Sequence, residues 1–199
     1  MIAEKLDRRV KRSKTLMRDA LIDLMKEKPF SEITAKDITE RADLNRATFY
    51  LHYNNVFELL DALENEAVEG FSRMLEDADI RQDAAWEYPL IGHICDYIVE
   101  NPELCRCLLL NPHSDRLAKK LAEIMKQKGQ KVQQEMGLKI EAHKADYIHQ
   151  FIAYGSMGMV KQWLMEGMPL SKEEMMELAE KMVRPIFRIL IPSEQQKEK

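Results

Sequence analysis

The chain has 199 residues, a hydrophobic fraction of 45% and a formal net charge of −4, which suit a folded protein with an ample core. No apolar run approaches the roughly 18 to 20 residues that cross a bilayer, and no signal-peptide stretch follows the charged N-terminal residues, so we expect a cytoplasmic protein without a membrane partner. The cysteines Cys95, Cys105 and Cys107 form no CxxC pair, which argues against a disulfide framework or a zinc site, and we interpret them as small core residues.

Basic residues are concentrated near the N-terminus. Residues 1–56 hold 12 Lys and Arg against 9 Asp and Glu, so this part carries +3, whereas the remaining 143 residues carry −7. Most of the basic excess lies in the first 18 residues. A basic arm on an acidic protein indicates a polyanionic partner for this end alone, the alternative being a solvated, frayed terminus.

Hydrophobic periodicity predicts the first helix and a short second one. Met17, Ala20, Leu21, Leu24 and Met25 have the i, i+3, i+4, i+7, i+8 spacing of one buried stripe. This helix should end near Lys28, because Pro29 disfavours helical geometry in the residue before it. The second helix is expected to start after Thr34, an N-cap with the acid Asp37 at N3, and to end at Arg41 or Ala42.

A third helix is expected at residues 46–53, with Asn45 as its N-cap. Phe49 and Tyr53 are four residues apart and form its buried face, which leaves Arg46, Thr48, Tyr50 and His52 facing outward. A further capping pattern at residues 55–58 starts a long fourth helix. Its inward-facing residues are Val56, Leu59, Leu60, Leu63, Ala67 and Phe71.

Two short helices with a three- to four-residue turn between them, preceded by a stabilising helix, are typical of a helix-turn-helix. A small three-helix bundle without a DNA role is the alternative. The pattern T-x-x-x-I-x-x-x-A at residues 34–42, followed by the run Thr48-Phe49-Tyr50-Leu51-His52-Tyr53, resembles the TetR family of bacterial transcriptional regulators. The resemblance covers roughly residues 11 to 63 and implies a DNA-binding domain.

The resemblance also implies which residues contact DNA. Thr34 and Lys36, with the basic arm, should meet phosphates, and residues 45–48 should lie nearest the base edges. The family commonly carries K-x-K where this chain has Asn54-Asn55-Val56, so phosphate contacts should be weaker there. The expected DNA-binding residues are Arg9, Arg12, Lys14, Thr34, Lys36, Asn45, Arg46, Ala47, Thr48, Tyr50, His52 and Asn54.

Further helices are expected at about 84–100, 103–110, 114–136, 141–166 and 171–190, which gives an all-α chain of about nine helices. Gly129 is a weak point in one of them, and Pro185 should kink or split the last. We expect a DNA-binding domain at residues 1–54 and a helical regulatory and dimerisation domain at residues 55–199, with the helix from residue 55 bridging the two.

Residues 151–167 are similar to the F-x3-G-x3-[VI]-x2-W-L-x2-G helix of many such regulators, which implies a homodimer built from this helix and the last one. The two helices also carry more apolar surface than one core can cover, although closing a monomeric core is the alternative. A two-fold dimer suits a palindromic double-stranded operator. The expected interface residues are Phe151, Gly155, Gly158, Met159, Trp163, Met175, Ala179, Met182 and Ile186.

The resemblance further implies a repressor, or an activator, whose operator binding responds to a small molecule in the C-terminal domain. Core packing explains the candidate pocket residues equally well; they are Trp86, Tyr88, Tyr97, Met125, Tyr147, Tyr154, Met157 and Met159. The histidines show no metal-ligand spacing, and we expect neither a metal nor another cofactor. An all-helical enzyme using His93 with Cys95 or Cys107, and a helical scaffold protein, are alternatives without a sequence signature.

Overall fold

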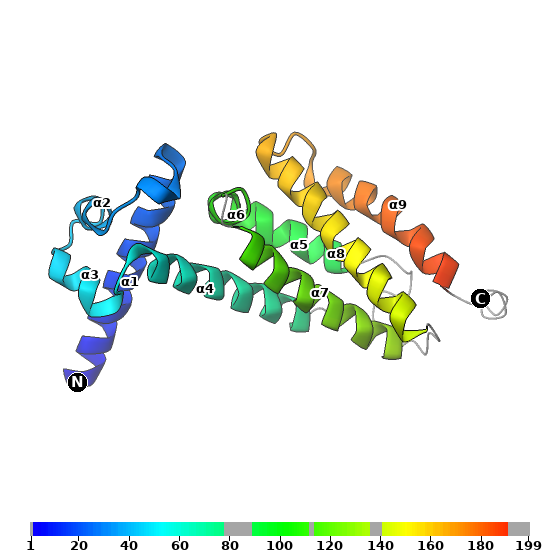
Figure 1. The fold of residues 1–199 in the computed structure, drawn as a ribbon, viewed down its shortest axis with the longest axis horizontal. Coiled ribbons are helices and arrows are strands. Elements are labelled where there is room, and N and C mark those ends of the chain that lie inside the picture. The colour runs from blue at the N-terminus through cyan, green and yellow to red at the C-terminus, as the bar shows by residue number, and fades with distance from the viewer. Residues whose placement is uncertain (1, 78–88, 112–113, 136–140, 191–199) are drawn as a thin grey trace. The chain divides into compact units, whose positions relative to one another are not determined.

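The computed structural model describes residues 2–77, 89–111, 114–135 and 141–190. Within these residues the chain forms nine α-helices and no strand, which confirms the predicted all-α fold. The elements, shown in Figure 1, are α1 (Ile2–Glu27), the 3₁₀ helix η1 (Phe30–Glu32), α2 (Ala35–Arg41), α3 (Arg46–His52), α4 (Val56–Asp77), α5 (Pro89–Glu100), α6 (Pro102–Leu109), α7 (Asp115–Glu135), α8 (Ala142–Met165) and α9 (Lys172–Leu190).

The predicted and observed helices agree closely in their bounds. The segments expected at 103–110, 141–166 and 171–190 are α6, α8 and α9, and each observed end lies within one residue of the expected one. The segment expected at 84–100 is α5, with residues 84–88 outside the described part of the chain. α9 continues through Pro185, so the helix is not split there; a proline removes one backbone hydrogen bond without ending this helix.

The chain divides into two compact units, residues 1–67 and 68–199, and α4 belongs to both. In the first unit the inner faces of the helices meet in one core. Its most deeply buried side chains are Met17, Leu21, Ile38, Phe49 and Leu59, each exposed by 1% or less. Burial of such a side chain contributes about 1.5 to 3 kcal/mol, so the periodic apolar positions of the sequence hold these helices together.

The turn between α2 and α3 is fixed by backbone geometry as well as by burial. Asp43 has φ 51°, a left-handed conformation that Asp tolerates better than most residues. The N–H of Leu44 then donates to the carbonyl of Thr39 at 2.9 Å, and Ala42 is buried beside the turn. The second short helix therefore leaves the first at a defined angle.

A capping box begins α2, as the sequence predicts. The N–H of Asp37 donates to Oγ1 of Thr34 at 3.2 Å, and the N–H of Thr34 donates to Oδ2 of Asp37 at 2.8 Å. Lys28, just after α1, adds a hydrogen bond to the same carboxylate oxygen at 2.9 Å. The Lys28 hydrogen bond first, and those from Thr34 next, lower the pKa of Asp37 to about 2.

The second unit contains helices that pack in pairs, α7 along α8 and α5 along α9, as Figure 1 shows. Trp163 near the end of α8 is 2% exposed, and its indole N–H donates to the carbonyl of Leu170 at 3.0 Å. Gly167, with φ 80°, supplies the left-handed residue that ends α8. These contacts hold the α8–α9 turn closed, so the two helices run antiparallel.

Gly129 does not interrupt α7, contrary to the weakness expected there. It faces His149 of α8, which is 6% exposed, and a Cβ built on Gly129 would lie 2.9 Å from Cδ2 and 3.1 Å from Nε2 of that ring. Burial lowers the pKa of His149, so the neutral ring is the form that fits. The glycine therefore admits a buried imidazole between two helices.

We predict that Gly129→Ala destabilises the protein although alanine favours helix. Overpacking against a buried ring costs about 1 to 3 kcal/mol, and the helix propensity of alanine offsets about 1 kcal/mol of this. Gly70→Ala in α4 is the matched control, because its Cβ would meet Tyr97 at an ordinary 3.5 Å and should stabilise. Urea unfolding of both variants measures the difference. A Gly129→Ala protein more stable than the wild type would contradict the packing explanation. In a His149→Ala background, where the ring is absent, the same stabilisation would not contradict it.

We further predict that Asp37 makes stability depend on acid pH. Because the folded pKa of about 2 lies below the ordinary 3.8, the ionised carboxylate stabilises the fold above pH 3.8, and this contribution disappears as the pH falls through about 2. Urea midpoints of the wild type and Asp37→Asn should therefore converge at low pH and separate above it. Lys28→Ala should raise the pKa of Asp37, so that the stabilisation by its carboxylate is lost at a higher pH. Parallel curves for the wild type and Asp37→Asn would show that the cap contributes no such linkage.

Candidate nucleic-acid interface

Helix α3 presents its outer face because its inner face is buried. Phe49 is fully buried and Tyr53, directly after the helix, is 8% exposed. Oδ1 of Asn45 accepts a hydrogen bond from the N–H of Ala47 at 2.8 Å, which confirms the predicted N-cap. Arg46, Ala47 and Tyr50 are then exposed, and the two other residues expected on this face, Thr48 and His52, are half-buried.

Arg46 and Tyr50 form a pair on this surface. Nη2 of Arg46 donates to the Tyr50 hydroxyl at 3.2 Å, and the guanidinium carbon lies 5.6 Å from the centre of the tyrosine ring. The residues are four apart and so lie one above the other on the helix. The ring orients the guanidinium and leaves its other N–H groups free to donate, a fork that suits the O6 and N7 acceptors of guanine or a phosphate.

Two ion pairs join α1 to its neighbours in the first unit. Arg41 of α2 donates from Nη2 to both carboxylate oxygens of Glu27 at 2.9 and 2.8 Å. This hydrogen bond lowers the pKa of Glu27 and raises that of Arg41. Arg18 of α1 donates to Glu66 of α4 at 2.7 Å. Such exposed pairs stabilise little, so the buried core rather than these pairs holds the helices of the unit together.

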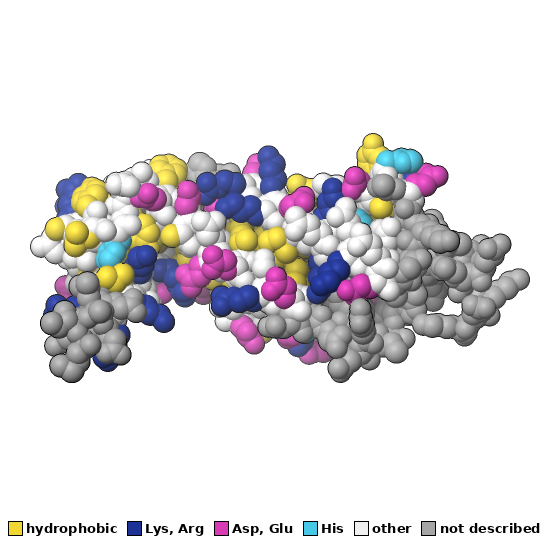
Figure 2. Space-filling view, turned by 90° about the horizontal axis from the view of Figure 1, so that it is seen from below, with side chains coloured by type: hydrophobic (Ala, Val, Ile, Leu, Met, Phe, Trp, Pro, Cys, Tyr) yellow, Lys and Arg dark blue, Asp and Glu magenta, His cyan; other side chains and the backbone are white. Residues whose placement is uncertain are grey.

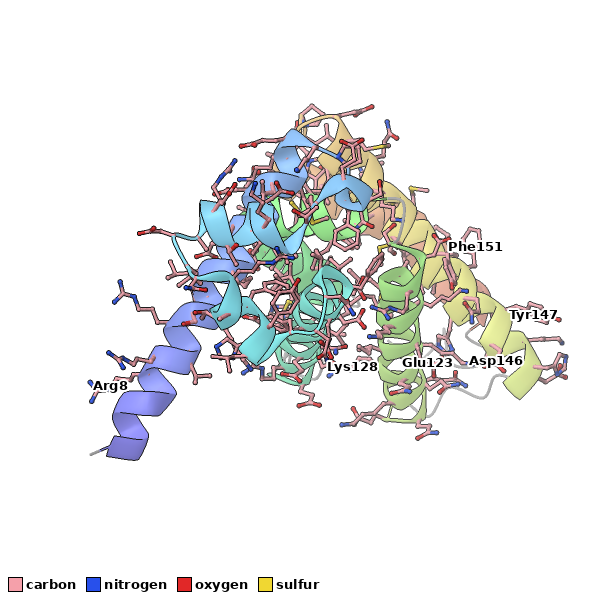
Figure 3. The ribbon with its side chains drawn as sticks, turned by 60° about the vertical axis from the view of Figure 1, so that its left-hand side comes forward. Arg8, Glu123, Lys128, Asp146, Tyr147 and Phe151 are labelled. Carbon is pink, nitrogen blue, oxygen red and sulfur yellow. The ribbon has the colours of Figure 1, made fainter. Side chains whose placement is uncertain are left out.

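The basic arm is part of α1, which begins at Ile2. Arg9, Arg12 and Lys14 are exposed on this helix, and Figure 3 shows Arg8 projecting from it. At the end of Figure 2 that holds the N-terminal unit, basic and hydrophobic side chains both reach the surface. A helical arm presents its positive charges at regular spacing.

Two of the expected phosphate contacts compete with capping interactions. The Thr34 hydroxyl already donates to Asp37 Oδ2 at 2.8 Å. Asn54 donates from its backbone N–H to Glu58, and from Nδ2 to Oε1 of the same carboxylate at 3.1 Å. Glu58 in turn is held by Asn55, whose Oδ1 accepts from the Glu58 N–H at 3.0 Å. A carboxylate beside Asn54 disfavours a phosphate there.

The sequence did not single out two exposed hydrophobic residues of this unit. Leu51 on α3 is 80% exposed, and Phe57 on α4 is 61% exposed with its ring centre 5.1 Å from that of Phe30. The Phe57 contact joins η1 to α4 and explains why that ring is there. Helical spacing could have identified Leu51, because it lies one turn after Ala47 and therefore on the same outward side of α3.

The expected pocket residues differ widely in exposure. Trp86 and Tyr88 lie outside the described residues. Met125 is buried, Tyr97, Met157 and Met159 are half-buried, and Tyr154 is 48% exposed. Tyr147 is 77% exposed and projects outward from α8, as Figure 3 shows, so this residue does not line a cavity of the described chain.

The expected interface residues also separate into two groups. Trp163, Met175 and Ala179 are at most 5% exposed within the second unit, because its own core uses them. Ile186 is half-buried, and Phe151 and Met182 are 68% and 56% exposed. Gly155 and Gly158 are exposed, and a Cβ on either would meet nothing within 4 Å. The exposed group alone remains available to a second chain.

The described residues offer little for catalysis by thiol or metal. Cys95, Cys105 and Cys107 are buried, as expected, and burial raises the pKa of Cys95 to about 11 and that of Cys105 to about 12. Thiols that keep their protons are poor nucleophiles. Among the described residues no three His, Cys, Asp or Glu side chains converge as metal ligands, and none of the described helices is long and apolar enough to span a membrane.

Comparison with known proteins agrees with this arrangement. Residues 18–63 match the family model of bacterial regulatory proteins of the TetR family, and residues 87–185 match a TetR model described as a transcriptional regulator C-terminal region. An uncharacterised helix-turn-helix regulator of Bacillus subtilis strain 168, YxbF, is 41% identical over 61 residues, which are 30% of this chain and 16% of that protein.

Solved structures share the fold over both units. A TetR regulator from Streptococcus agalactiae 2603V has a TM-score of 0.67 and 23% identity, covering 91% of this chain and 98% of that one. FadR from Bacillus subtilis, solved in complex with stearoyl-CoA, has a TM-score of 0.66 and 16% identity, covering 89% and 97%. The two family matches together span both units of the fold, and the chain belongs to the TetR family of DNA-binding transcriptional regulators.

Proposed function

We propose that this regulator is a repressor that binds a palindromic operator as a homodimer and leaves it when a small molecule binds the second unit. It acts in the cytoplasm and has no catalytic role. The observation that carries this proposal is the continuity of α4, which runs from Val56, beside the α3 surface, to Asp77 in the second unit. One helix thus belongs to both the DNA-binding and the regulatory part.

Contacts at both ends of α4 support such coupling. Toward its start, Leu59, Leu60 and Leu63 are at most 3% exposed in the first unit. In the second unit, the Tyr97 ring of α5 lies beside Gly70, and Lys128 of α7 donates to the carbonyl of Leu75. A molecule that displaces α5 or α7 therefore moves the end of α4, and the helix transmits the displacement toward α3.

The effector we propose is a hydrophobic small molecule. Tyr97, Met125, Met157 and Met159 are the candidate pocket residues that the described part of the chain keeps off the open surface. Methionine side chains adapt to ligands of irregular shape. An effector changes operator affinity only through its different affinity for the two states, and typical couplings correspond to about 5- to 150-fold.

Within the DNA-binding unit we propose a division between positioning and reading. Lys36, Tyr50 and the arm residues contact phosphates, with weaker contacts from Thr34, His52 and Asn54. Arg46, oriented by Tyr50, reads a guanine in each half-site, and Asn45, Ala47 and Thr48 approach neighbouring base edges. The support for this division is the exposure of the Arg46 guanidinium at the start of α3 and of the basic side chains on α1.

Selection of duplexes from a random-sequence pool, followed by titration of variants at several salt concentrations, tests the function. Arg46→Ala should relax the preference at one base pair per half-site, worth about 1 to 3 kcal/mol. Lys36→Ala should weaken binding to all duplexes alike and reduce the salt slope of log K by about 0.9 for each phosphate that the variant no longer neutralises. The selected duplex, placed upstream of a reporter gene, should lower expression in the presence of the protein.

Lys181→Ala is a matched control for Lys36→Ala. Both lysines pair with a glutamate four residues away on a helix and are similarly exposed, at 69% and 68% of the side chain, but Lys181 lies on α9. It should change neither affinity nor salt slope. If Lys36→Ala changed the base preference and Arg46→Ala weakened binding to all duplexes alike, the division between positioning and reading would be refuted. Failure to select any sequence would refute operator binding. Activation of the reporter gene would make the protein an activator.

The homodimer is proposed to form through exposed residues of α8 and α9, principally Phe151, Gly155, Gly158 and Met182. Figure 3 shows Phe151 and Tyr147 pointing away from the helices of their own unit. The exposed glycines permit close approach of a partner helix. The buried Trp163, Met175 and Ala179 support this surface from within rather than forming it.

Replacement of Phe151 and Met182 together by Glu should give monomers, because the interface would bury unpaired charges. Operator affinity should fall with the dimer, since one chain contacts one half-site. Val99→Glu on α5 is the control, which adds one glutamate at a hydrophobic residue that is 48% exposed. Sedimentation of the three proteins measures the oligomeric state, and a dimeric double variant would place the interface elsewhere.

A further inference from the structure

The centre of the outward face of α3 is apolar. Leu51 is 80% exposed, more than any other large hydrophobic residue in the described part of the chain, and Ala47, one turn earlier, is also exposed. A helix advances about 100° per residue, so Ala47 and Leu51 lie on the side opposite the buried Phe49 and Tyr53. We call this pair the 47/51 strip.

Polar groups border the strip on both sides. Tyr50, with the Arg46 guanidinium held against its ring, lies along one edge, and Thr48 lies along the other. Within the unit Leu51 buries little of its surface, so packing in its own core does not account for a leucine there. The strip offers neither a donor nor an acceptor, and its shape is a small residue followed by a large branched one.

We propose that the 47/51 strip reads the C5-methyl group of a thymine in each half-site. In the major groove this methyl is the one apolar group by which a base pair is distinguished. Ala47 lets the helix approach the base, and Leu51 covers the methyl and removes it from water. The proposal rests on the assignment of α3 as the reading helix in the proposed function, and it adds a thymine specificity to the guanine contact of Arg46.

Replacement of thymine by deoxyuridine isolates this contact, because it removes the methyl group and leaves the base-pairing edge and the groove acceptors unchanged. We take the duplex selected by the wild-type protein and replace its thymines one symmetric pair at a time. At one of these pairs, the affinity of the wild-type protein for the duplex should fall by about fourfold for each methyl group removed. This factor is the one expected for burying a single carbon of that kind. Leu51→Ala should bind the original duplex more weakly and lose most of its discrimination between thymine and deoxyuridine at that pair.

Two further variants keep the test specific. Leu51→Met retains an apolar side chain of similar volume and should retain the preference for thymine. Val99→Ala, at an exposed apolar residue of α5, should change neither affinity nor preference. Circular dichroism of Leu51→Ala should match the wild type, since an exposed side chain is removed.

Three outcomes overturn the proposal. Equal binding of all deoxyuridine duplexes by the wild type would show that no thymine methyl is read. A Leu51→Ala protein that is weaker on every duplex but still discriminates thymine from deoxyuridine would assign Leu51 to the sugar–phosphate backbone. Both results leave a selected operator intact and refute this inference alone, whereas failure to select any sequence refutes the proposed function as well.

Discussion

Everything at the DNA-binding end depends on the burial of one face of a very short helix. α3 has seven residues, fewer than an isolated helix needs to persist in water. Phe49, fully buried against the core of the first unit, supplies the tertiary contact that holds it, and the Asn45 side chain satisfies an N–H at its start. Because those two interactions fix the inner face, the direction of the outer face is fixed too.

The same short helices need their polar side chains for capping, and this limits what remains for a ligand. Thr34 and Asn54 carry groups that suit phosphate, yet both are engaged by carboxylates of their own unit, Asp37 and Glu58. Those carboxylates also reduce the positive potential, and residues 1–56 carry only +3. The basic residues of this part are concentrated on α1, where Arg9, Arg12 and Lys14 are exposed.

The sequence predicted most of the fold because each of the first four helices buries one apolar face. Met17, Ile38, Phe49 and Leu59 each lie on the buried stripe of their own helix, and a periodic pattern of this kind leaves one choice of inner face. Gly129 was misread because the reason for a glycine there, the His149 ring, lies on another helix. Local rules contain no information about a neighbour 20 residues away.

The C-terminal sites were less predictable for a related reason. α8 carries hydrophobic residues around much of its circumference, so periodicity does not distinguish Trp163, which is 2% exposed, from Phe151, which is 68% exposed. Such a helix has more than one apolar side: one face closes the core of the second unit, and another is exposed. Where hydrophobic residues lie around a whole helix, only the packing of the folded chain shows which of them its own core buries.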